Sequence, residues 1–352
     1  MSIFSSRSKS GTSQNSTPSE NKPTVVVTGA AGLLGANFCK YLCDKGYRVV
    51  GVDNLSGGYR EFVDPRVEFI VSELTVESDF EYVMNEYGIE VDYIYHFAAY
   101  AAAGLSPFIR NFNYKNNVIA SGNLINYAIN YGVKKFIFAS SMEVYGEQTP
   151  PFDETCDLKP ETPYGIAKMA VELDLKSAYQ THGLDYAIVR PHNVHGIYQN
   201  IWDRYRNVIG IFIRKALNGE DLTVYGDGKQ MRAFSDVDFY NEPFEKLMYD
   251  HSCETFNIGA DKPTTILELA QAVQKIAGEY GDRPNIVFAE ARNEVKVAYC
   301  DHTKAKNLLD FEDGTDLEWL IKKMYLWAQG QPNRKVKKMK MEVQKGLYSY
   351  WK

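Results

Sequence analysis

The sequence lacks any run of 18 apolar residues, about the length that a transmembrane helix needs. A membrane span is therefore not expected. The first 22 residues also lack an apolar core, so they do not have the pattern of a secretory signal. They are rich in serine and threonine and carry Arg7 and Lys9 against a single acid, Glu20. This composition predicts a disordered polar tail over residues 1–22, with an organelle transit peptide as the alternative.

Cysteine is also scarce, and the chain carries no net positive charge. The formal net charge is -6, which argues against nucleic acid as the main partner, because phosphate binding favours a basic face. The cysteine count is odd and no Cys-x-x-Cys occurs, so we expect no metal site and a reducing, cytoplasmic location. The five thiols expected to be reduced are Cys39, Cys43, Cys156, Cys253 and Cys300.

What is present is a regular alternation of strands and helices. Short apolar, β-branched runs alternate with helical patterns, which predicts an α/β fold with a doubly wound parallel sheet of Rossmann type. The expected strands are 24–28, 47–53, 67–71, 93–98, 136–140 and 186–190, and the expected helices between them include 33–45, 78–87 and 117–131. Two further short strands are expected later in the chain, at 222–225 and 256–259.

A glycine-rich turn follows the first expected strand. Gly29, Gly32 and Gly35 are spaced Gly-x-x-Gly-x-x-Gly and open a helix. Glycine allows a tight turn and close approach of a pyrophosphate, and the helix N-terminus offers N–H groups and a positive dipole end. Asp53 ends the next strand, where an acid binds the ribose 2′-hydroxyl and repels a 2′-phosphate. The pattern therefore favours NAD over NADP.

A second constellation combines Ser141, Tyr164 and Lys168. Tyrosine has a pKa near 10, too high for a base at neutral pH, but a nearby ammonium group favours the phenolate. Residues four apart share one face of a helix, so Lys168 can reach the Tyr164 oxygen or a cofactor ribose beside it. Together with the glycine turn, these residues predict hydride chemistry on an alcohol carbon.

These motifs and several others follow one another in a familiar order. The chain resembles the extended short-chain dehydrogenase/reductase family, and within it the nucleotide-sugar epimerases and dehydratases, UDP-glucose 4-epimerases in particular. The resemblance runs from about Thr24 to Gly330. The other segments that support the resemblance are Asp53-Asn54-Leu55-Ser56, His96-Phe97-Ala98-Ala99, Ser140 to Gly146, Arg190-Pro191-His192-Asn193, Leu222 to Gly226 and Glu290-Ala291-Arg292.

The resemblance implies two sets of binding residues. The residues implied to line NAD, besides the three glycines, are Leu33, Leu34, Asp53, Asn54, Glu73, Leu74, Ala98, Ala99, Asn117, Tyr164 and Lys168. The residues implied to bind a nucleotide-diphosphate sugar are Asn193, Asn207, Thr223, Val224, Tyr225, Arg232 and Arg292. Guanidinium groups suit the diphosphate because they grip phosphate oxygens in pairs.

The sequence departs from the family pattern at positions that bear on the reaction. Glu73 stands where an aspartate is usual, and its longer side chain can still accept a hydrogen bond from adenine. His195-Gly196-Ile197 replaces a common Tyr-Gly-Pro in the pocket wall. Met142 stands where a 4,6-dehydratase of the deoxythymidine-diphosphate type carries an acid, and methionine cannot donate a proton. Glu143 matches a glutamate that serves as a base at C5 in dehydratases and decarboxylases.

We therefore expect an NAD-dependent nucleotide-sugar 4-epimerase, acting on a UDP-hexose of the UDP-glucose and UDP-galactose type. Ser141, Tyr164 and Lys168 are the expected catalytic residues, with Glu143 beside them. The alternative is a 4,6-dehydratase or UDP-glucuronate decarboxylase that uses Glu143 at C5. A more remote alternative is a non-catalytic NAD-binding regulator, which would typically have lost Tyr164 or Lys168.

The expected organisation has four parts. After the tail come an NAD-binding domain over 23–190, to which strands return from about 234–259, and a mainly substrate-binding part over 191–330. Residues 331–352 carry many lysines and are expected to form a basic, solvated tail or helix face, with an interaction tail as the alternative. The resemblance also implies a homodimer, because helices corresponding to 117–131 and 164–179 form the interface in relatives.

Overall fold

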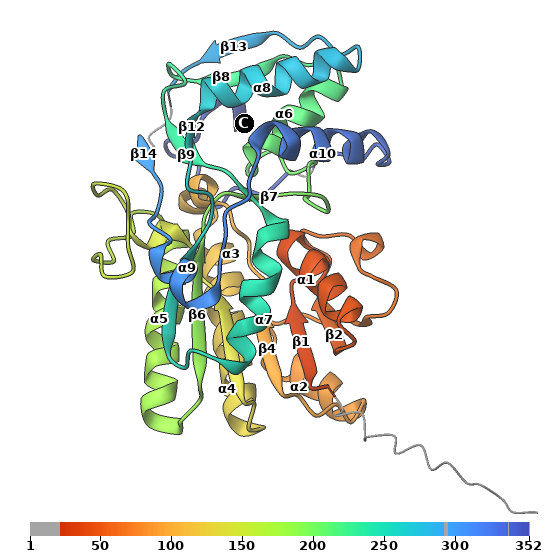
Figure 1. The fold of residues 1–352 in the computed structure, drawn as a ribbon, viewed down its shortest axis with the longest axis vertical. Coiled ribbons are helices and arrows are strands. Elements are labelled where there is room, and N and C mark those ends of the chain that lie inside the picture. Colours follow the sequence, from red (N-terminus) through yellow and green to blue (C-terminus); the bar gives the residue numbers. More distant parts are fainter. Residues whose placement is uncertain (1–21, 292–294, 337, 352) are drawn as a thin grey trace, which may run out of the picture.

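The computed structural model describes residues 22–291, 295–336 and 338–351. Its central feature is a seven-stranded sheet in which every neighbouring pair of strands is parallel (Figure 1). The strands, in spatial order, are β11 (Glu254–Ile258), β6 (Tyr186–Pro191), β5 (Lys135–Ala139), β4 (Tyr93–His96), β1 (Thr24–Thr28), β2 (Arg48–Asp53) and β3 (Glu68–Val71). The Rossmann-type fold expected from the sequence is confirmed.

Helices cover both faces of this sheet, because successive side chains of each buried strand point to opposite faces. Val25 and Val27 of β1 pack in one cluster and Val26 in another. The first face is covered by α1 (Leu33–Asp44), α7 (Asn241–Tyr249) and α9 (Thr303–Leu309). The second is covered by α2 (Glu77–Glu86), α4 (Ala120–Asn130) and α5 (Pro163–His182).

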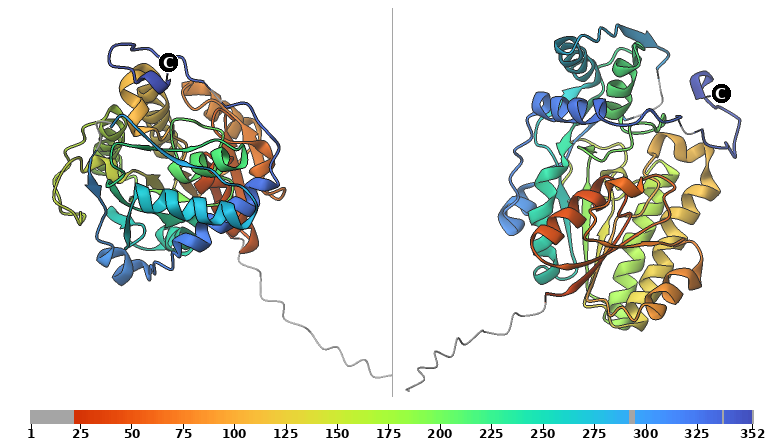
Figure 2. Two further views of the ribbon diagram at one scale, coloured as in Figure 1. Left: turned by 90° about the horizontal axis from the view of Figure 1, so that it is seen from above. Right: turned by 90° about the vertical axis from the view of Figure 1, so that its right-hand side faces the viewer.

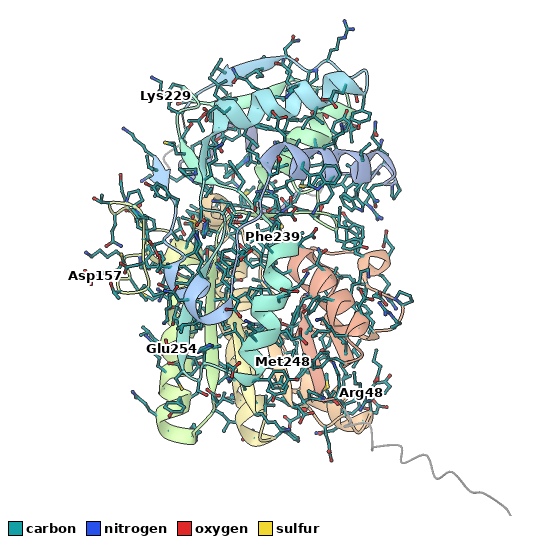
Figure 3. All side chains as sticks on the ribbon, in the orientation of Figure 1. Arg48, Asp157, Lys229, Phe239, Met248 and Glu254 are labelled. Atoms are coloured by element: carbon teal, nitrogen blue, oxygen red, sulfur yellow. The ribbon has the colours of Figure 1, made fainter. Side chains whose placement is uncertain are left out.

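A smaller part lies beyond the carboxyl ends of the strands, at the top of Figure 1. Its core is formed by α6 (Val208–Leu217), α8 (Ile266–Glu279) and α10 (Leu317–Gln329), packed on the strand pair β8 (Leu222–Tyr225) and β13 (Ile286–Ala289). Short strands connect it to the large sheet: β7 (Val194–His195), β9 (Met231–Ala233), β10 (Ser235–Asp236), β12 (Pro263–Thr265) and β14 (Val297–Ala298). Figure 3 labels Phe239, whose ring lies where the two parts meet and would clash with a Cβ at Gly314.

Local sequence explains where the longest helices begin and end. The Thr162 side chain caps α5 by accepting from the Gly165 N–H, and Pro163 stands at the first helical position. The helix stops at Gly183, whose φ of 75° suits glycine. Thr265 and Glu268 form a capping box at the start of α8. None of the helices described has the length and apolar character needed to cross a membrane.

The expected solvated tail at 331–352 is wrong for its last part. Leu347 and Trp351 are only 8% and 6% exposed, and they pack with residues of the loop after β4. Figure 2 shows the segment that follows α10 crossing the molecule and ending near α3 (Arg110–Tyr114). The number of lysines indicated a solvent-exposed segment. Apolar residues interspersed among the lysines instead make this segment bury one side.

Candidate functional site

The glycine turn joins β1 to α1 and forms one wall of a large pocket. A Cβ at Gly35 would lie 2.1 Å from the Gly29 carbonyl oxygen, so the helix can approach the turn this closely only with glycine there. Gly29 itself has φ +69°, and its Cβ would meet the Ala98 backbone at 2.8 Å. At Gly32, by contrast, a Cβ would contact only the Gly29 oxygen, at 3.3 Å, and Gly32 lines the pocket.

The N-terminus of α1 has no side-chain cap, which leaves its first N–H groups for an anion. Gly32, at the N-cap, lines the pocket without adding a side chain to it. The turn therefore fits a dinucleotide pyrophosphate in both shape and charge, and Leu33 and Leu34 line the same wall.

The next part of the wall carries three polar residues. Asp53 is 9% exposed, and its carboxylate accepts from the Ala31 N–H at 3.0 Å and the Leu55 N–H at 2.7 Å. Burial raises the pKa of this carboxyl, and the two N–H groups oppose the rise. Glu73 accepts from the Asn54 amide at 2.9 Å and from the Thr75 hydroxyl. These contacts hold the longer side chain of Glu73 in place beside Leu74 on the pocket wall.

Two expected cofactor residues after β4 lie on the wall, and a third lies behind it. Ala98 and Ala99 line the pocket, but Asn117 does not. Asn117 is 1% exposed, and its side-chain oxygen accepts from the Tyr100 N–H at 3.0 Å. The structure thus gives Asn117 the role of holding the loop that carries the two alanines.

The expected catalytic residues meet at the carboxyl end of β5. Ser141 and Glu143 follow this strand, and the Ser141 hydroxyl accepts from the Glu143 N–H at 3.2 Å. Tyr164 lies in the first turn of α5 and is 6% exposed. Burial raises the pKa of its phenol, and so does the charge of Glu143, whereas a hydrogen bond with Ser141 and the charge of Arg206 lower it.

Lys168 lies one helical turn after Tyr164, buried at 2% exposure. Its Nζ donates to the Ala139 carbonyl oxygen at 2.7 Å and stands 5.8 Å from the centre of the Tyr164 ring. Burial lowers the pKa of Lys168 to about 7, and the charge of Glu172 opposes that shift. The lowered pKa means that the protonation of Lys168 changes near neutral pH.

Sequence reasoning missed the network behind these residues. Glu172 is fully buried and accepts from Arg190 twice, at 2.6 and 3.0 Å, and from the Ser140 hydroxyl at 2.5 Å. Arg190 also donates to the Tyr145 hydroxyl at 2.8 Å. The available signal was the spacing of Tyr164, Lys168 and Glu172, which places a carboxylate on the same helix face as the two expected catalytic residues.

The opposite end of the pocket contains most of the expected substrate residues. Asn193, Asn207, Thr223, Tyr225 and Arg232 line it. Asn193 and Asn207 both have positive φ, at 44° and 67°. Val224 is different: it is fully buried and packs in the core between β8 and its helices, because alternate residues of a strand face opposite sides. Arg292 lies outside the described residues.

Four further cations within residues 204–215 line the pocket and were not identified from the sequence: Arg204, Arg206, Arg214 and Lys215. Arg214 pairs with Glu220 through Nη1 at 3.3 Å, while its buried Nε has no hydrogen-bond partner among the described residues. Lys215 donates to the Thr223 hydroxyl at 2.7 Å, and burial lowers its pKa. In the sequence, the signal was that these cations lie close to Asn207 and within the segment that forms α6.

The pocket joins these walls into one cavity of about 1290 Å³. A site for one drug-sized ligand occupies about 300–1,000 Å³, so this cavity exceeds the size of a single such site. Among the described residues, no group of three or more His, Cys, Asp or Glu side chains could hold a metal ion. The arrangement suits proton and hydride transfer on an anionic ligand, with a tyrosine as the proton-transfer group.

Comparisons with known proteins agree with this geometry. Residues 25–259 match the model of the NAD dependent epimerase/dehydratase family. A putative UDP-glucose 4-epimerase from Methanocaldococcus jannaschii is 31% identical over 309 residues, which cover 87% of this chain and 98% of that protein. A UDP-N-acetyl-alpha-D-glucosaminuronate decarboxylase from Bacillus cytotoxicus is 30% identical over 320 residues, with the same coverage of both chains.

A solved structure adds the match in three dimensions. The UDP-glucose 4-epimerase of Thermotoga maritima, crystallised with UDP-glucose, superposes with a TM-score of 0.81 at 33% identity. The match covers 87% of this chain and 98% of that one.

The lowered pKa of Lys168 predicts a pH-dependent stability. Between about pH 7 and its usual 10.5, the unfolded chain holds a proton that the folded chain has lost, so the free energy of unfolding rises with pH. The Lys168→Met variant lacks this rise, which amounts to at most about 1.4 kcal/mol per pH unit. Denaturant unfolding at pH 7.5 and about pH 9.5 should therefore show the parent gaining stability relative to the variant.

The exposed Lys176, on the same helix, supplies the matched control as Lys176→Met. Its stability should follow that of the parent at both pH values. Parallel curves for the parent and Lys168→Met would mean that Lys168 keeps an ordinary pKa in the folded protein.

Proposed function

The chain belongs to the NAD-dependent epimerase/dehydratase family, whose members modify nucleotide sugars, and on this basis we propose that it is a 4-epimerase of a UDP-hexose. Its cofactor is NAD. The observation that carries the proposal is the meeting of Ser141, Tyr164 and Lys168 between a wall that suits a dinucleotide and a wall rich in cations. One substrate carbon can thus lie beside both the tyrosine and the cofactor.

The proton is handled by the chain's own residues. Ser141 hydrogen-bonds with Tyr164, so it can bridge the phenol to the sugar C4 hydroxyl, and Tyr164 takes the proton. Burial raises the pKa of Tyr164, which opposes this step, whereas the hydrogen bond with Ser141 and the charge of Arg206 favour it. Lys168, one helical turn away, would favour the phenolate as well when it is protonated. NAD, when bound, supplies the acceptor for the hydride that leaves C4.

The cations at the far wall explain how the sugar can be inverted. Arg204, Arg206 and Arg214 can hold the diphosphate while the 4-keto sugar turns over in the cavity. The hydride then returns to the opposite face of C4, and Tyr164 gives the proton back. Because the diphosphate anchor lies apart from the reacting carbon, the sugar can turn without leaving the protein.

Met142 favours epimerisation over 4,6-dehydration. It is 8% exposed on the pocket wall, and its sulfur is 3.9 Å from the amide nitrogen of Asn193. A thioether at this position cannot protonate a leaving hydroxyl. The second candidate function, C5 chemistry in a decarboxylase or dehydratase, is favoured by Glu143, which lines the same cavity.

We also propose that the protein is a homodimer. Large apolar side chains are exposed along the helices that the sequence resemblance assigns to the interface: Ile119 at 51%, Leu173 at 52% and Tyr179 at 47%. An exposed apolar surface of this kind on a folded chain suits contact with a second copy.

If the protein is a homodimer, light scattering should give twice the mass of one chain. Leu173→Glu should convert it to monomer, because the carboxylate would be buried without a partner. Leu326→Glu, an exposed leucine on α10, should leave the mass unchanged. A parent protein with the mass of one chain would contradict the proposal.

Tyr164→Phe tests the proton-transfer step. The variant loses only the phenol oxygen, so it should bind NAD as the parent does while turnover of UDP-galactose falls by about 10²–10⁴-fold. Turnover is measured from the two sugar signals by NMR. The control is Tyr87→Phe at a 68% exposed position, which should behave as the parent. Activity of Tyr164→Phe within a few-fold of the parent would exclude this mechanism.

Glu143→Gln separates the two candidate functions. Epimerisation at C4 never breaks the C5–H bond, so the glutamine variant should keep most of its activity, whereas C5 chemistry should fall by roughly 10²-fold or more. The companion measurement is deuterium at C5 of the product formed in D₂O, and none is expected. Deuterium at C5 together with a large loss in the variant would favour a dehydratase or decarboxylase.

A further inference from the structure

The segment Met339–Trp351, here called the roof segment, lies across the cation-rich end of the pocket. Its first part is fixed at α3: the Glu342 carboxylate accepts from the Asn111 N–H at 2.7 Å and the Phe112 N–H at 2.9 Å. The N–H groups of Glu342 and Val343 donate to the Phe108 carbonyl oxygen. A carboxylate at a helix N-terminus is a favourable position for that charge.

Apolar contacts fix the end of the roof segment. The Trp351 ring packs edge-on against Phe108 at 5.9 Å and against Tyr205 at 5.5 Å between ring centroids. Leu347 joins the same cluster, which includes Tyr100 and Leu105. The segment is thus attached both near its start and at its end to elements that form the pocket.

Between these attachments, two tyrosines reach the pocket. Tyr348 and Tyr350 both line it, and their rings stack at 5.2 Å with an interplanar angle of 9°. The Tyr350 ring is 4.7 Å from the ring of Tyr225, which ends β8 on the opposite side. Arg204, a pocket cation, donates to the Tyr350 carbonyl oxygen. Three aromatic rings therefore stand together beside the arginines.

The roof segment covers the pocket and does not fill it. The cavity of about 1290 Å³ is measured with the segment in place, and it still exceeds the volume that a single drug-sized ligand requires. A segment that blocked the site would occupy the space between the glycine turn and the cations. The geometry is that of a wall at the cation-rich end of the pocket.

We propose that the roof segment is part of the nucleotide-sugar site, and that Tyr348 and Tyr350, together with Tyr225, form an aromatic wall against which the nucleotide base packs. Aromatic faces accept any base by stacking, and the neighbouring arginines would hold the diphosphate. The identity of the ligand as a nucleoside diphosphate rests on the proposed function. The assignment of the roof segment to its binding goes beyond that function.

The test measures binding of UDP and of NAD by calorimetry, without turnover. The Tyr348→Ala/Tyr350→Ala double variant should bind UDP about tenfold more weakly, since stacking on an aromatic ring contributes this much or more. A chain shortened after residue 335 should lose at least as much. NAD affinity should be unchanged in both, because the glycine turn lies at the other end of the pocket.

Two controls accompany these variants. Tyr348→Phe/Tyr350→Phe keeps the rings and should bind UDP as the parent does. Tyr82→Ala removes a tyrosine that is 64% exposed on α2 and should change neither affinity. If the shortened chain does not fold, the double alanine variant, which keeps Leu347 and Trp351, decides the question.

The outcomes separate the inference from the proposed function. Equal UDP affinity in the parent and the double alanine variant would overturn the inference, and so would tighter binding by the shortened chain, which would make the roof segment a plug. A parent chain that binds no UDP would also overturn it. UDP binding that depends on both rings, without epimerisation of any UDP-hexose, would reject the proposed function and support the inference.

Discussion

The site depends on a single buried ion pair, Glu172–Arg190. Its carboxylate holds the Ser140 hydroxyl next to Ser141, and Glu172 lies one helical turn beyond Lys168. Arg190 extends the network from β6 to Tyr145, whose hydroxyl donates to Asn257 of β11. Removing one partner of such a pair leaves an uncompensated charge in the core, at a cost of about 3–5 kcal/mol. The pair therefore fixes how β5, α5, β6 and β11 meet at the carboxyl edge of the sheet.

The positions of many expected site residues could be predicted from local sequence, independently of this ion pair. The glycine turn, Asp53 and the Tyr164–Lys168 pair each depend on spacing within one strand–turn–helix unit or one helical turn, and backbone geometry determines such spacings. The parallel sheet then brings the carboxyl ends of its strands to one edge, so residues far apart in the chain share one pocket. For these residues, sequence order and fold class together were sufficient.

The placement of the other site residues depends on tertiary packing, which the spacing of residues along the sequence does not determine. Asn117 stands in a π-helical turn at Lys115–Ile119, and its side chain faces the backbone of the loop at Tyr100. Val224 lies between two pocket residues and still points into the core, as strand alternation requires. The roof segment was misjudged because its lysines dominate the composition, while Leu347 and Trp351, which decide its position, are few. Burial of Lys168, and hence its pKa, could be known only once both faces of α5 were placed.

The path of the chain between the two parts has a consequence for how the protein unfolds. After β6 the chain enters the smaller part through α6 and β8, returns to the sheet for α7 and β11, and goes back for α8 and β13 (Figure 1). The chain returns to the sheet once more to form α9, before α10 completes the core of the smaller part. Neither part is a continuous stretch of sequence, so unfolding one removes strands or helices from the other. The molecule should therefore lose its structure in one cooperative transition, and no single backbone cleavage would yield two fragments that each retain a complete core.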